Sequence, residues 1–286
     1  MNIKHYLLDI GMSITEFSNK CGLPYSTIAE LANGKKTLSK CTAGTVYRIA
    51  KELGISVESL LEKENDLMYP NKYTLDKKTS LFLAKKYWDQ NVYCGMKMEN
   101  RNITFPQTKT ILEGINVSGV TLDDITAVLN MRDAWKYMLD TFDSKLDLEY
   151  ILRLNSFISR NESLEWGVLR KGSVGISGSD YKPPVPEKNE VERAINEILL
   201  SYKTSTEKAI DMFCLITYKQ LFWDGNKRTA ICAANKILLS SGNGMITIID
   251  SVMFEFNELL CSIMHSTGDK EKLKKFIHEK ALFGLD

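Results

Sequence analysis

The first part of the chain is a series of short amphipathic segments separated by turn signals. Five segments with apolar residues at helical spacing lie between residues 3 and 62. Ser13 precedes the second segment and Glu16 follows three positions later, which is the pattern of a capping box at a helix start. Pro24 opens the third segment, and glycines close three of the segments, at Gly22, Gly34 and Gly54. The pattern therefore predicts a domain of five short helices over residues 1–66.

The rest of the chain is also patterned mainly as helices. Residues 63 to 80 are charged, contain Pro70 and lack a clear period, so we place the domain boundary there. Beyond it, helical spacing covers residues 79–90, 107–116, 121–141, 146–159, 187–201, 207–221, 228–241, 252–266 and 269–282. Alternation typical of strands is confined to about 165–177 and 245–249. We expect a mainly α protein whose second domain, 67–286, is an all-helical body with one β-hairpin.

The second and third segments have the arrangement of a DNA-reading motif. A tight turn around Cys21 to Leu23 joins them, and such a turn sets one helix across another and projects it outward. Over nearly its whole length this domain resembles the phage-repressor (XRE-like) helix-turn-helix module, which implies binding to DNA. A small helical protein-interaction domain is the alternative. Because modules of this size usually bind two-fold sites as dimers, we also expect a homodimer.

Polar side chains on the third segment are the candidate DNA contacts. Ile28, Leu31 and Ala32 share its apolar face, which leaves the opposite face for DNA. Small hydroxyl and amide groups can bond base edges, and lysines can neutralise phosphates. The predicted contacts are Tyr25, Ser26, Thr27, Glu30, Asn33, Lys35 and Lys36.

Composition narrows the choice of partners and of compartment. The 286 residues carry 37 basic and 36 acidic side chains, so contact with nucleic acid must come from a local patch. The six cysteines form no CxxC pair and no zinc-ligand pattern, which indicates free thiols in a reducing cytoplasm. No stretch approaches the roughly 18 apolar residues of a membrane-spanning helix, and the first residues lack a signal peptide. We expect a cytoplasmic protein without a membrane partner.

The segment most informative about chemistry is a polar loop between two apolar helices, QLFWDGNKRTA at residues 220–230. After Gly225, the amides of Asn226, Lys227 and Arg228 begin a helix, where unpaired donors and the helix dipole favour an anion. Asp224 supplies a hard oxygen suited to Mg²⁺, and the guanidinium of Arg228 can hold a phosphate. The loop therefore predicts a phosphate site, although a plain helix-loop-helix with an Asp-Arg pair would share the pattern.

This loop resembles the signature of the Fic/Doc family, H-x-F-x-[DE]-G-N-[GK]-R, with Gln220 at the histidine position. The resemblance implies ATP as the nucleotide, Mg²⁺ at Asp224, phosphate binding by residues 225–228, and Phe222 as an anchor of the loop. Residues 166–186 resemble the flap hairpin of that family, at which an extended segment of a target protein would pair near Val174, Gly175 and Ile176. Glu113 and Gly114 resemble the end of the inhibitory pattern [ST]-x-x-x-E-[GN], but Lys109 stands at the hydroxyl position.

Departures from the family pattern leave three functions open. Glutamine cannot act as the general base that histidine provides, which removes a contribution of roughly 10² to 10⁴-fold. Lys227 and Ile231 replace the glycine and second arginine of AMP-transferring members, and the lysine resembles the phosphate-transferring Doc branch. We expect a DNA-binding regulator with a nucleotide-binding domain of weak or no transferase activity. An active transferase of AMP or phosphate onto a protein hydroxyl, and an interaction protein that binds no nucleotide, are the alternatives.

Overall fold

The computed structural model describes Ile3, Leu7 and residues 11–32, 36–65, 69–175, 181–201, 203–264 and 270–285, with only the backbone at 62–65. The predicted DNA contacts Asn33 and Lys35 and the predicted flap residue Ile176 lie outside the described residues. Two hydrophobic cores organise the described chain: one gathers residues from Ile3 to Leu60, and the other gathers residues from Tyr69 to Leu282.

The first core belongs to the N-terminal helical module. Its elements are α2 (Ile14–Cys21), α3 (Tyr25–Ala32), a 3-10 turn (Leu38–Lys40), α4 (Ala43–Leu53) and α5 (Val57–Asn65). Ser13 caps α2 by accepting from the amide of Glu16, whose carboxylate returns a hydrogen bond to Ser13, so the predicted capping box is confirmed. Gly22 ends α2 with φ 62°. This left-handed turn directs α3 across α2, as a helix-turn-helix requires.

The larger body is built from ten helices that the structure describes, together with a minimal sheet. The helices are α6 (Lys77–Lys86), α7 (Trp88–Met98), α8 (Phe105–Leu112), α9 (Leu122–Asp140), α10 (Leu148–Ile158), α11 (Lys188–Leu200), α12 (Ser205–Lys219), α13 (Asn226–Ser240), α14 (Asp250–Ile263) and α15 (Lys270–Phe276). A π-helical turn, Ile277–Ala281, follows α15. None of the described helices is both long and apolar enough to cross a membrane.

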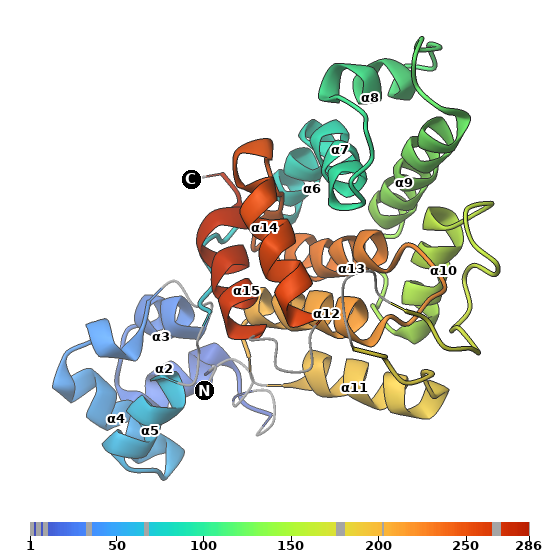
Figure 1. Ribbon diagram of the computed structural model, residues 1–286. Helices are drawn as coiled ribbons and strands as arrows, with labels where there is room; N and C mark the ends of the chain where they lie inside the picture. The colour runs from blue at the N-terminus through green and yellow to red at the C-terminus, as the bar shows by residue number, and fades with distance from the viewer. Residues whose placement is uncertain are drawn as a thin grey trace.

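Helices α12 and α13 form the centre of this body (Figure 1). From Asn226 to Leu239, nearly every side chain of α13 is buried, because α6, α7, α9, α10 and α12 all pack against it. Helices α14 and α15 cover another side, with Phe256 of α14 between Phe213 of α12 and Phe276. The loop between α12 and α13 is therefore held from both ends by buried helices.

Two expected elements differ in the structure. The pattern at 79–90 predicts one helix, but the chain forms α6 and then α7, with Tyr87 between them at φ −113°. Helix α7 lacks an amphipathic period because both its sides are covered: residues 91–96 and Met98 are all buried.

Of the two patterns typical of strands, the one at 245–249 contains a short strand, whereas the described residues of the pattern at 165–177 form none. Strand β1 (Met245–Ile246) pairs antiparallel with β2 (Leu282–Phe283). The described parts of the flap region, 166–175 and 181–186, are extended or bent without strand pairing.

A strap of extended chain, residues 69–76, connects the two cores and lies against the larger body. The hydroxyl of Thr204 donates to the carbonyl of Tyr69 at 2.6 Å, and the amide of Asn243 donates to the carbonyl of Tyr73 at 2.8 Å. The backbone amide of Leu75 donates to the carbonyl of Gly242 at 2.7 Å. The strap is thus a structural part of the larger body rather than a loose linker.

Candidate functional site

The polar loop predicted to bind phosphate joins α12 to α13 and is conformationally constrained at both ends. Gln220 ends α12 in the left-handed region, with φ 47°, and Gly225 precedes α13 with φ 70°. A side chain at Gly225 would meet Cγ2 of Ile158 at 2.8 Å, so both the backbone angle and the neighbouring helix require glycine. Phe222 is buried between these ends, as expected of the residue that anchors the loop.

The side chain of Gln220 is held by hydrogen bonds within the loop. Its Nε2 donates to the carbonyl of Thr217 at 2.6 Å, and its Oε1 accepts from Nδ2 of Asn226 at 3.1 Å. Asn226 in turn donates to the carbonyl of Phe222 and accepts from its amide, both at 2.9 Å. Asn226 therefore shapes the loop, and Gln220 contributes a neutral amide to it.

Two cations follow Asn226, and carboxylates meet both of them. Nζ of Lys227 lies 2.9 Å from Oε2 of Glu99 and donates to the carbonyl of Met98 at 2.6 Å. The guanidinium of Arg228 is 1% exposed, and its Nη1 lies 3.0 Å and 3.2 Å from the two oxygens of Glu162. Burial lowers the pKa of Arg228, but Glu99 and Glu162 more than offset this and raise it above its ordinary value. The positive charge of the loop is already compensated within the protein.

The carboxylates at this loop are not the one expected from the sequence. Glu113 is exposed at the C-terminal end of α8 and forms no ion pair among the described residues. Glu99, at the end of α7, lies 3.7 Å from Nε of Arg228 instead. The sequence contains a signal for it: Glu99 and Asn100 also match the end of [ST]-x-x-x-E-[GN]. Asn100 takes φ 55°, the left-handed region that glycine and asparagine tolerate.

Glu162 was missed because nothing in its surroundings marks it. It follows α10 on a turn, and its carboxylate also accepts from Arg101 at 2.6 Å and from Asn130 at 2.9 Å. These partners lie 30 to 70 positions away in the chain, so only the tertiary fold gathers them.

Asp224, the expected metal ligand, is the one acidic residue of the loop, and its side chain is 46% exposed. Its Oδ1 accepts from the amide of Gly225 at 2.6 Å, and its Oδ2 lies 3.8 Å from Arg228. Among the described residues no three His, Cys, Asp or Glu side chains gather as a metal site. Asp224 therefore fits Mg²⁺ only as a single protein ligand, which is usual where phosphates supply further oxygens.

The flap region is clamped to the loop by a buried arginine that the sequence did not single out. Arg170 is 1% exposed and donates to the carbonyls of Gln220 and Gly172, each at 2.6 Å. It also donates to the carbonyl of Pro184, on the returning arm, at 2.6 Å. Gly172 lies directly against the ring of Trp223, where a Cβ would not fit. Val174 is half-buried and Gly175 is exposed just beyond this clamp.

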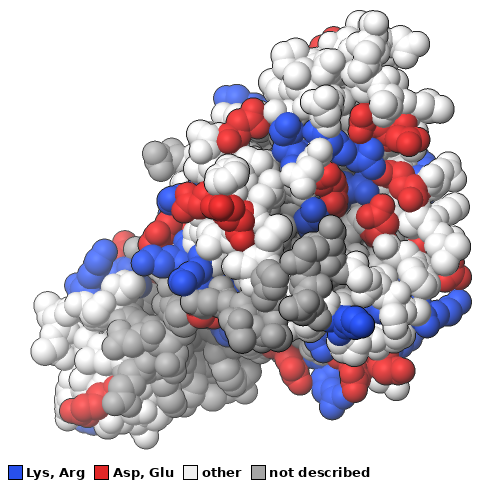
Figure 2. Space-filling view, in the orientation of Figure 1, with Lys and Arg blue, Asp and Glu red and all other residues white. Residues whose placement is uncertain are grey.

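The N-terminal module presents the described DNA candidates on α3, except for Lys36, which follows that helix. Ile28, Leu31 and Ala32 are buried, as predicted, while Tyr25, Ser26 and Glu30 are exposed and Thr27 and Lys36 are half-buried. On the face drawn in Figure 2, basic and acidic side chains are interspersed over the larger body without a broad basic area. Of the three histidines, His278 contacts the carbonyl of Pro70 on the strap and is not at the loop.

The glycine-containing loop joins two central helices, and Arg170 fixes the neighbouring flap to it. The same chain carries the helix-turn-helix module. Residues 145–238 match the Fic/DOC family, and residues 2–66 match the Cro/C1-type HTH DNA-binding domain. The larger body therefore has a Fic-like fold, and a helix-turn-helix domain stands at the N-terminal end of the chain.

Similar proteins agree with this assignment. A protein adenylyltransferase Fic from Nematostella vectensis is 27% identical over 257 residues, which is 86% of this chain and 57% of that protein. The protein of the same name from Drosophila yakuba is 29% identical over 171 residues, 55% of this chain and 33% of its own length. The chain thus spans between a third and three fifths of these relatives. The fold of Fic-1 from C. elegans covers 96% of this chain and 82% of that one, with a TM-score of 0.58 at 16% identity.

Proposed function

We propose that this protein is a DNA-binding regulator whose Fic domain binds an adenine nucleotide and transfers AMP or phosphate weakly or not at all. The observation that carries the proposal is the side chain at the position of the family's catalytic histidine. Gln220 holds an amide that is bonded at both ends, to Thr217 and to Asn226. An amide does not accept a proton near neutral pH, so the loop lacks the base that would activate a target hydroxyl.

The carboxylate of Glu99 opposes the binding of phosphate at the loop. It lies against Lys227 and Arg228, the two cations that follow the loop. A phosphate that approaches these cations must compete with Glu99 for them, which weakens nucleotide binding. We therefore assign to Glu99 the inhibitory role that the sequence pattern suggests for Glu113.

The loop retains the parts that hold a nucleotide. The amides of Asn226, Lys227 and Arg228 are the first of α13 and have no acceptor within the helix. Asp224 would hold Mg²⁺, and the metal would supply neutralisation of the negative charge of the phosphates. The names of the curated relatives favour ATP as the nucleotide.

Nucleotide binding is tested by calorimetry with Mg²⁺-ATP on the wild type, Glu99→Gln and Glu113→Gln. Because Glu99→Gln removes a charge that competes with phosphate, we expect binding to tighten about tenfold, the equivalent of roughly 1.4 kcal/mol. The same exchange at the exposed Glu113 is the matched control and leaves affinity unchanged. Tighter binding in Glu113→Gln alone would contradict the role of Glu99, and no binding in any variant would favour the interaction-only function.

Transfer is tested with ATP labelled at the α or the γ phosphate. We expect little or no label in the wild type and in Glu99→Gln, and label in the double variant Gln220→His, Glu99→Gln, which restores the base and frees the cations. The alternative, an active transferase, is favoured by the names of the relatives. Label incorporated by the wild type at the rate of the double variant would establish it and exclude the proposal.

DNA binding is tested by footprinting on the promoter of the protein's own gene. Protection there, with a salt dependence set by lysine contacts, is the expected result. Protection of two symmetry-related half-sites, whose centres lie about one turn of the DNA helix apart, would further support a dimer. Absence of any protection at low salt would assign the N-terminal module to protein contacts instead.

A further inference from the structure

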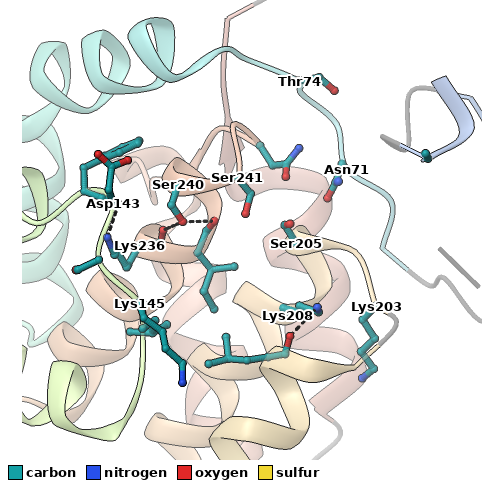
Figure 3. Close-up of a pocket in the computed structure, with 17 residues that line it drawn as sticks. Asn71, Thr74, Asp143, Lys145, Lys203, Ser205, Lys208, Lys236, Ser240 and Ser241 are labelled. Atoms are coloured by element: carbon teal, nitrogen blue, oxygen red, sulfur yellow. Dashed lines mark hydrogen bonds between the residues drawn. The ribbon is translucent and has the colours of Figure 1, made fainter. Parts of the chain in front are cut away.

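A cavity of about 740 Å³ lies away from the phosphate loop, at the opposite end of α13. Its walls are the strap after the N-terminal module, the loop after α9, the start of α12 and the end of α13 (Figure 3). Ala32, the last residue of α3, also lines it. The cavity therefore touches both the DNA-reading module and the Fic body, and its volume is in the range of small-molecule sites.

Lysines dominate the charge of this cavity. Lys145, Lys203, Lys208 and Lys236 line it against one acidic residue, Asp143. Two of these charges are satisfied elsewhere, because Asp143 pairs with Lys77 and Lys203 pairs with Asp211.

The remaining lysines present positive charge to the cavity. Lys236 is 2% exposed, and its ammonium donates to the carbonyls of Thr141 and Phe142. It also lies 5.2 Å from the ring centroid of Tyr150 and 5.8 Å from that of Phe142. An ammonium has three donors, so these two hydrogen bonds leave one N–H of Lys236 for another acceptor. Lys145 is exposed at the rim of the cavity and has no ion pair among the residues that the structure describes. Lys208 is 7% exposed and donates to the carbonyl of Leu199 at 2.8 Å.

Neutral donors complete the lining. Figure 3 shows Asn71, Ser205 and Ser241 together along one side of the cavity, while Lys145 and Lys208 come from another. Oδ1 of Asn71 accepts from the amide of Thr206, which leaves its NH₂ group to donate. Ser205 begins α12, whose positive dipole end therefore lies at this wall.

We propose that this cavity binds a small anion that carries one or more phosphate groups. Lys236 forms no ion pair among the described residues, and Asp143, which pairs with Lys77, compensates its charge only in part. An anion beside this buried ammonium would offset the remaining cost of burial, while Lys145 and the hydroxyl and amide donors orient it. Burial lowers the pKa of Lys236 to about 8, so the side chain is still mainly protonated at pH 7 and available to such an anion. The site is separate from the phosphate loop and does not depend on the nucleotide bound there.

The test is isothermal titration of the full chain with inorganic pyrophosphate in a buffer free of phosphate and sulfate. Lys145→Gln is the main variant, because an exposed side chain can be replaced without loss of the fold. Lys109→Gln on α8 makes the same charge change away from the cavity, and Lys227→Gln makes it at the phosphate loop.

The expected result is saturable binding that Lys145→Gln weakens about fivefold and that Lys109→Gln leaves unchanged, as for loss of one partly exposed charge contact. Absence of saturable binding at millimolar pyrophosphate overturns the proposal. So does binding that Lys227→Gln weakens and Lys145→Gln does not, because the anion would then occupy the phosphate loop.

Discussion

Replacing Glu162 by glutamine tests whether the charges around the phosphate loop stabilise the fold. The side chain of Glu162 is 7% exposed and meets the guanidinium of Arg228, which is 1% exposed. Arg101 and Asn130 bond the same carboxylate. The substitution keeps the shape of the side chain and one carbonyl acceptor but removes the negative charge, so it leaves Arg228 buried with less compensation.

The expected cost follows from the burial of the pair. Removing one partner of a buried ion pair typically costs about 3–5 kcal/mol. Glu99, within 3.7 Å of Arg228, still supplies part of the compensation, so we expect the lower end of this range, about 3 kcal/mol. Glu149→Gln is the matched control, since that carboxylate is 72% exposed and its contact with Lys188 is 3.5 Å. A surface pair of this kind contributes at most about 1 kcal/mol.

Urea unfolding followed by tryptophan fluorescence measures this difference in the relevant domain. The four tryptophans are Trp88, Trp135, Trp166 and Trp223, and all lie in the larger body. The free energy of unfolding is obtained from the midpoint and the slope of the transition. A loss below about 1 kcal/mol for Glu162→Gln, similar to Glu149→Gln, would refute the view that Glu162 holds the buried charge of Arg228.

Three further predictions concern the loop, the cavity and the DNA module. Gly225→Ala should lower the free energy of unfolding in urea by about 1–3 kcal/mol and abolish Mg²⁺-ATP binding, because φ 70° and Ile158 exclude a Cβ. Gly175→Ala is the control and should change neither quantity, because a Cβ at Gly175 meets open space. The folded protein releases the proton of Lys236 near pH 8, before the unfolded chain does at 10.5, so wild-type stability relative to Lys236→Met should rise by about 2 kcal/mol between pH 8 and pH 10 in urea titrations. Lys36→Ala should lower the slope of log affinity against log salt by about 1 in fluorescence anisotropy with operator DNA.

Each of these has a contradicting result. Equal stability of Gly225→Ala and Gly175→Ala would show that the loop tolerates a side chain. A stability difference between wild type and Lys236→Met that does not change with pH would show that the lysine is not titrating in this window. An unchanged salt slope would remove Lys36 from the phosphate contacts.

In the described part of the N-terminal module, the ends of α2 and the apolar face of α3 were predictable because their signals are local. The capping box of Ser13 and Glu16 and the glycine at position 22 set the ends of α2 through contacts of three or four positions. The apolar face of α3 follows from helical spacing.

The phosphate loop was also predictable as a loop. Its glycine, its buried phenylalanine and the helix that begins at Asn226 lie within seven consecutive residues. The helices around the loop were harder to predict from the sequence, because α7 is covered on several sides and shows no amphipathic period.

The sequence alone thus indicated the two modules and the polar loop that contains Gln220, since each depends on neighbouring residues and backbone geometry. Only the tertiary structure decided which charges meet at that loop. Glu99, Glu162 and Arg170 reach it from segments between 50 and 130 positions away, and burial makes their pairing strong. The same packing brings the end of α3, the strap and the end of α13 around one lysine-lined cavity. Charge compensation in a buried site depends on distances between remote segments, and no local pattern records those distances.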